Sequence, residues 1–165
     1  MIVATTGTKL GGTPAQHEAL YQTLLRLNGP DYFSVAHGCC VGWDEEFHNN
    51  VRAWFPRSPI YGHPSNIPGK VARLDFREDW DTLYQPLPPL VRNCLIVDGE
   101  WMVRDPADVL IAAPKGFSEE VRSGTWATVR LARKTRRPDG VTGILICIIW
   151  PDGRVKEEQP TSISI

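Results

Sequence analysis

Two short apolar runs constrain the fold more than any other feature of the chain. VLIAA at 109–113 is closed by a proline, and GILICIIW at 143–150 precedes an Asp-Gly turn. Runs of this kind are typical of strands buried on both faces of a parallel sheet. Such a sheet needs helices on its faces, so strands and helices should alternate along the chain.

The first sixty residues show this alternation. Strands are predicted over 1–6, 32–37 and 58–62, each followed by a glycine turn or a helical pattern. One helix is predicted to begin at Thr13-Pro14 and to end at Asn28-Gly29-Pro30, and a second, capped by Asp44, to end before Pro56. Their order indicates parallel strands joined by helical crossovers.

The rest of the chain continues this order with one interruption. Residues 63–89 show no helical pattern, although Ala72, Leu74 and Phe76 alternate with charged residues as in a half-buried strand. A connection of this length is uncommon unless it binds or covers something. A short helix over 89–97 and another that begins near 123–125 are expected, and 154–158 should turn back as a hairpin. We therefore expect one three-layer α/β domain, residues 1–165, with a mainly parallel sheet flanked by helices and a C-terminal β-hairpin.

Composition excludes several classes of protein. With 165 residues, 42% hydrophobic and 22% charged, and a net charge of −1, the chain reads as a soluble globule and not as a disordered tail or a binder of duplex nucleic acid. The N-terminus has no signal-peptide pattern and no run approaches the roughly 20 apolar residues of a membrane span, so a cytoplasmic location is expected. The four cysteines include no CxxC spacing and are expected to be reduced thiols.

Two loops are the places to look for a ligand, because open α/β sheets bind ligands beyond the carboxyl ends of the strands, where strand order reverses. The loop after the first strand contains Gly7 and Thr8, and its glycines would let backbone amides approach a ligand. It matches neither the dinucleotide fingerprint nor the P-loop, and no cofactor is predicted. Ligand binding and a plain turn both stay open for this loop.

The loop after 109–113 contains Lys115 and leads to a helix start. Free N–H groups and the helix dipole would let this start bind an anion, and residues 126–128 bring no carboxylate to its first turn. The candidate ligand contacts are Ser123, Gly124 and Thr125. The alternative is that Thr125 only caps the helix.

The helix that follows the second strand offers a different chemistry. Asp44 and two glutamates already fill its first turn, so the loop with His37, Gly38 and Gly42 suits ribose hydroxyls or a base amino group better than phosphate. The alternative is that these acids only complement the helix dipole. His37, Cys39, Cys40 and His48 fit no common zinc spacing, so no metal is expected.

Four stretches, AHGCCVGWDE, WDTLYQPLPPLVRN, ADVLIAAP and SGTWATVRLARK, occur in the order seen in the SLOG superfamily of Rossmann-like proteins, which includes Smf and the LOG enzymes. The chain most resembles the small stand-alone bacterial and phage members, over nearly its whole length to about Trp150. The family's glycine-rich motif is matched by Gly38, Gly42 and Asp44, its Arg-Asn pair by Arg92 and Asn93, and its Gly-Thr by Gly124 and Thr125.

This resemblance implies a nucleotide or nucleotide-derived ligand, with phosphate at Gly124 and Thr125. Arg92 would be a second anion contact, because its planar fork can bind phosphate at two points, although a surface ion pair is the alternative. The LOG enzymes carry a glutamate at the helix start where this chain has Ala127 or Thr128. A sensor or sequestering protein is therefore the first expectation, with a homodimer as its expected assembly.

Two other functions stay open. One is a phosphoribohydrolase acting on nucleoside monophosphates, in which Asp44, Glu119 or Glu120 replaces the missing glutamate. The other is single-strand nucleic-acid binding, as in Smf, through the basic run at 130–137, for which a solvated helix face is the simpler interpretation. The identity of the ligand and the role of residues 64–88 are left open by the sequence.

Overall fold

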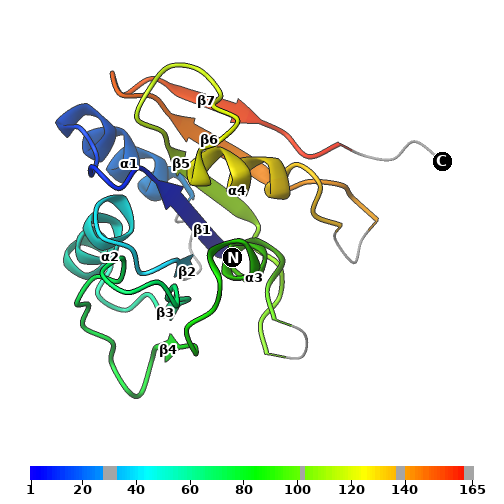
Figure 1. The fold of residues 1–165 in the computed structure, drawn as a ribbon. Coiled ribbons are helices and arrows are strands. Elements are labelled where there is room, and N and C mark those ends of the chain that lie inside the picture. The colour runs from blue at the N-terminus through cyan, green and yellow to red at the C-terminus, as the bar shows by residue number, and fades with distance from the viewer. Residues whose placement is uncertain (28–32, 101–102, 137–139, 162–165) are drawn as a thin grey trace.

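The computed structural model describes residues 1–27, 33–100, 103–136 and 140–161. One sheet of seven strands has the order β4-β3-β2-β1-β5-β6-β7 (Figure 1). The strands are β1 (Ile2–Gly7), β2 (Ser34–His37), β3 (Ile60–Gly62), β4 (Thr82–Leu83), β5 (Val109–Ala113), β6 (Leu145–Ile149) and β7 (Val155–Glu158). The helices are α1 (Pro14–Leu27), α2 (Trp43–Trp54), α3 (Pro89–Asp98) and α4 (Gly124–Ala132).

Strand pairing gives this sheet one edge at which its parallel strands all end. Every neighbouring pair is parallel except β6 and β7, which form the antiparallel hairpin predicted at the C-terminal end. β1 pairs with β2 on one side and with β5 on the other, so strand order reverses between β1 and β5. The edge at which the parallel strands end, here called the carboxyl edge, is where such folds bind ligands.

The helices cover the sheet from both sides and make the three predicted layers (Figure 1). Leu20 of α1 and Phe47 of α2 belong to the hydrophobic cluster on one face, and Val97 of α3 and Val129 of α4 belong to the cluster on the other. All five residues of β5 are buried, as expected for a strand between two layers of helices. The predicted α/β class is confirmed.

Residues 63–88 differ from the prediction. No strand forms over 72–76, and the one strand in this segment is the two-residue β4. The alternation of apolar and charged residues over 72–76 arises because this segment lies over the carboxyl edge with Phe76 turned inward. Phe76 is so close to β3 that a Cβ added to Gly62 would lie 2.4 Å from Phe76 Cζ. The predicted turn at 28–30 falls outside the described residues.

Candidate functional site

The loop after β1 is held by α2. The backbone N–H of Trp43 donates to the carbonyl of Thr8 (3.0 Å), and the N–H of Gly12 donates to Glu46 Oε2 (2.6 Å). Gly7 packs against the buried Trp43 ring, whose Nε1–H donates to Thr5 Oγ1 (2.7 Å). The glycines of this loop therefore serve close packing on α2, and Glu46 already occupies the amide of Gly12.

Gly7→Ala should be destabilising for this reason. A Cβ at this position would lie 2.2 Å from Trp43 Cγ, and Trp43 is 0% exposed, so the ring cannot move aside without disturbing the core. We expect a loss of about 1–3 kcal/mol in the free energy of unfolding, measured by urea denaturation. Gly124→Ala is the control, because nothing lies within 4 Å of its added Cβ.

At the end of β2, Arg92 reaches from α3 over Gly38 toward Asp44. Its Nη1 lies 3.9 Å from Asp44 Oδ2, and its Nη2 donates to Cys40 Sγ (3.1 Å). A Cβ at Gly38 would lie 1.3 Å from Arg92 Nη1, so a glycine is needed for this approach. The Nε of Arg92 is buried and has no partner. Two separately predicted motifs, the glycine-rich loop and the Arg-Asn pair, thus meet at one point. The buried Asn93 is the next residue of α3.

Asp44 is not the cap of α2, which corrects the sequence prediction. Gly42 is the N-cap, and its φ of +89° lets the chain turn into the helix two residues earlier than predicted. The Asp44 carboxylate accepts from the backbone N–H of Cys40 (3.2 Å). Burial raises the pKa of Asp44, and the charge of Arg92 opposes this rise.

His37 belongs to a buried hydrogen-bonded chain. Its Nδ1 accepts from the N–H of Cys39 (3.1 Å), its Nε2 faces His48 Nδ1 (3.0 Å), and His48 Nε2 faces the carbonyl of Asp75 (2.9 Å). Because a backbone N–H only donates and a carbonyl only accepts, His37 and His48 must both be neutral and donate through Nε2. Burial accordingly lowers the pKa of both rings. Through these hydrogen bonds, His37 and His48 connect the loop after β2 to residues 63–88.

Ser123, Gly124 and Thr125 lie beyond β5, on the other side of the strand-order reversal. Ser123 is the N-cap of α4 and accepts from the N–H of Trp126 (3.4 Å), which corrects the alternative that Thr125 is the cap. The helix begins two residues earlier than a cap at Thr125 would place it, because Ser123 adopts the extended backbone of a cap. Gly124 faces open space, and α4 has no acidic residue in its first turn.

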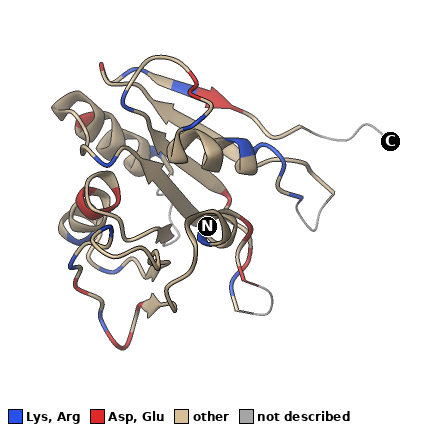
Figure 2. Cartoon of the chain, in the orientation of Figure 1, with Lys and Arg blue, Asp and Glu red and all other residues tan. Residues whose placement is uncertain are grey.

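The charged residues around α4 neutralise one another. Glu119 pairs with Arg130 (3.0 Å) and Arg133 (2.9 Å), and Lys115 Nζ lies 3.4 Å from Glu120 Oε2. Arg133 also pairs with Glu158 of β7, whose acidic residues lie beside the basic end of α4 (Figure 2). Surface ion pairs thus engage both candidate replacement acids, Glu119 and Glu120. They also engage Lys115 and part of the basic run.

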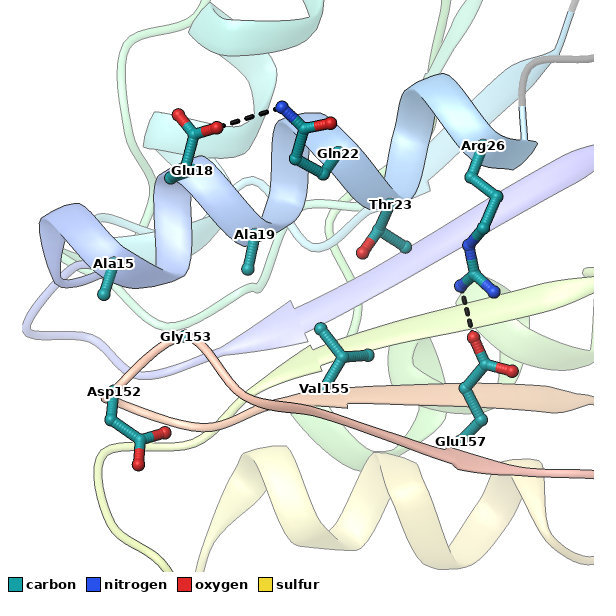
Figure 3. A pocket seen from close by; sticks show the side chains of 10 residues that line it. All are labelled: Ala15, Glu18, Ala19, Gln22, Thr23, Arg26, Asp152, Gly153, Val155 and Glu157. Atoms are coloured by element: carbon teal, nitrogen blue, oxygen red, sulfur yellow. Dashed lines mark hydrogen bonds and ion pairs between the residues drawn. The ribbon is translucent and has the colours of Figure 1, made fainter.

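Two cavities lie away from these residues. A groove of about 780 Å³ runs between α1 and the β6–β7 hairpin, closed at one end by the Arg26–Glu157 ion pair (Figure 3). A second cavity, of about 310 Å³, is lined by Asp98 and Lys134 near the ends of α3 and α4. None of the predicted site residues lines either cavity. The predicted site is thus a stretch of the carboxyl edge and not one of these hollows.

The structure brings part of the predicted set together. Gly38, Asp44 and Arg92 meet beyond β2, whereas Gly7 and Thr8 lie between them and the start of α4, with the N–H of Thr8 bonded to the carbonyl of Ala113 (3.1 Å). Within the described residues, no group of three or more His, Cys, Asp or Glu side chains is placed to hold a metal ion, and no helix is long and apolar enough to cross a bilayer.

Comparison with known proteins gives no match: no family model, no curated protein and no solved structure is similar enough to this chain to indicate a relationship. Any statement about function therefore depends on the site itself.

Proposed function

We propose that this protein binds a nucleotide or nucleotide-derived small molecule at the carboxyl edge, between Arg92 and the start of α4, as a sensor or sequestering protein. The observation that carries the proposal is the largely buried guanidinium of Arg92, whose side chain is 12% exposed. Its Nε has no partner, and its nearest carboxylate oxygen, that of Asp44, is 3.9 Å away. A buried arginine with unused donors is suited to bind a phosphate or another oxygen-rich group.

The start of α4 supports a second contact with the same ligand. Its first turn carries no acid, Gly124 leaves open space before it, and the adjacent strand β5 pairs with β1 where strand order reverses. A phosphate there would accept hydrogen bonds from backbone N–H groups and would lie at the positive end of the helix dipole. The SLOG resemblance puts phosphate at the same residues. Cytoplasmic location and homodimerisation stay predictions from the sequence.

An added carboxylate at this helix start tests the phosphate position. Thr125→Asp should weaken nucleotide binding by about tenfold or more, because the new charge occupies and repels the anion site. The measurement is a thermal-shift titration with nucleoside mono- and diphosphates and nucleoside diphosphate sugars. Gln159→Glu adds the same charge at an exposed residue elsewhere and should leave affinity unchanged. Equal affinities for Thr125→Asp and the unmodified protein would refute the phosphate position.

One observation favours an enzyme as the second candidate. The pKa of Asp44 is raised by burial at the carboxyl edge, and a carboxyl group that holds its proton more firmly is suited to general acid catalysis. Asp44 could then protonate the leaving base of a nucleoside monophosphate in a phosphoribohydrolase. Release of free base during incubation with nucleoside monophosphates, lost in Asp44→Asn, would establish this activity. Binding without release would leave the sensor function.

A further inference from the structure

His63 directly follows β3 and has no role in the site described above. It is 1% exposed, yet neither Nδ1 nor Nε2 has a hydrogen-bond partner. Its ring stacks on that of Tyr84, with centroids 4.3 Å apart and an interplanar angle of 8°, and the Tyr84 hydroxyl is also buried without a partner. Buried polar atoms are nearly always paired, so this pair of rings needs an explanation.

The charges of two arginines act on the His63 ring. Burial first, and then the charges of Arg104 and Arg92, lower the pKa of His63 to about 3. The ring is therefore neutral near pH 7, with one nitrogen that donates and one that accepts. Arg104 lies 5.6 Å over the Tyr61 ring, and its Nε, like that of Arg92, is buried and unpaired. Among the unpaired buried atoms of His63, Tyr84, Arg92 and Arg104, donors thus outnumber acceptors.

These side chains continue the proposed ligand site along the carboxyl edge. The backbone N–H of His63 donates to the carbonyl of His37 (2.9 Å), which directly precedes Gly38. Tyr84 follows β4, and its N–H donates to the carbonyl of Gly62 (2.9 Å). Because β4 has only two residues, the segment that carries Tyr84 can move aside at the cost of few hydrogen bonds.

We infer that His63 and Tyr84 form a base-recognition subsite that selects a nucleobase with a lactam edge, such as guanine, over adenine. A guanine carbonyl accepts hydrogen bonds from the Tyr84 hydroxyl and the arginine Nε–H groups, and its ring N–H donates to the free nitrogen of His63. The amino group of adenine only donates, so it would face the same donors without an acceptor. This inference rests on the proposed nucleotide binding.

The test compares GMP with AMP as probes. We expect the unmodified protein to bind GMP about tenfold or more tightly than AMP in calorimetric titrations. His63→Phe keeps a flat ring on Tyr84 and removes both nitrogens, so its GMP affinity should fall to the AMP value while AMP affinity stays unchanged. Its melting temperature without nucleotide should rise, because two buried unpaired atoms are gone.

A matched control is His17→Phe, since His17 also stacks on an aromatic ring, that of Trp43 (5.6 Å), and should leave the preference for GMP intact. Equal binding of GMP and AMP by the unmodified protein would overturn the subsite, and so would a preference that survives in His63→Phe or an equal loss of both nucleotides in it. Binding of neither nucleotide by the unmodified protein would instead overturn nucleoside monophosphate binding itself.

Discussion

At pH 5 the protein should be less stable than at pH 7.5 by about 4 kcal/mol, or about 2 kcal/mol for each of the two buried imidazoles His37 and His63, and His48 adds a smaller loss. His37, His48 and His63 are each no more than 1% exposed, and burial lowers the pKa of all three. In the unfolded chain these groups take up protons below about pH 6.5. The folded protein takes up fewer protons, because the pKa of each buried ring is lowered, so acid favours the unfolded state and stability falls as pH falls through 6.5.

Urea denaturation at a series of pH values measures this loss. The pH dependence of the free energy of unfolding near pH 5 should correspond to at least two protons taken up on unfolding. His63→Phe should reduce the loss by about 2 kcal/mol, because one imidazole no longer titrates. At lower pH the raised pKa of Asp44 has the opposite effect, because the folded protein then binds this proton more readily than the unfolded chain. Equal stability at pH 5 and 7.5 would contradict the prediction.

Much of the fold could be predicted because a strand between two helical layers must be apolar along its whole length. β5 therefore covers the same five residues as the predicted run. The alternation around Phe76 was misleading for a physical reason: a segment that lies over the sheet can also turn every second side chain inward. How deeply Phe76 is inserted depends on its contact with Gly62. No local sequence pattern reveals such a contact.

The site could be predicted only as separate motifs. Arg92 and Asp44 are 48 positions apart, and only the folded chain shows that the arginine passes over Gly38 to reach the acid. The sequence likewise does not show which charges pair. Glu119 could therefore be considered a replacement acid, although it forms ion pairs with Arg130 and Arg133. His63 was missed because an unpaired buried histidine has no signature in sequence. The length of the 63–89 connection was the one available signal.

Arg92→Met should destabilise the protein by about 3–5 kcal/mol, because it leaves the Asp44 carboxylate buried without its cation. The side chains of Arg92 and Asp44 are 12% and 9% exposed, which separates this pair from an ordinary surface ion pair. Arg26→Met is the matched control: it removes the partner of Glu157 at a side chain that is 56% exposed, and should cost less than about 1 kcal/mol.

The double variant Asp44→Asn/Arg92→Met distinguishes the buried charge from lost packing. Neutralising the acid removes the unpaired charge, so most of the stability lost in Arg92→Met should return. Stability is measured by urea denaturation at pH 7.5, and nucleotide binding should be lost in both variants because the guanidinium is absent. A loss below about 1 kcal/mol in Arg92→Met would mean that Arg92 forms only a surface ion pair. A double variant no more stable than Arg92→Met would assign the loss to packing of the arginine stem.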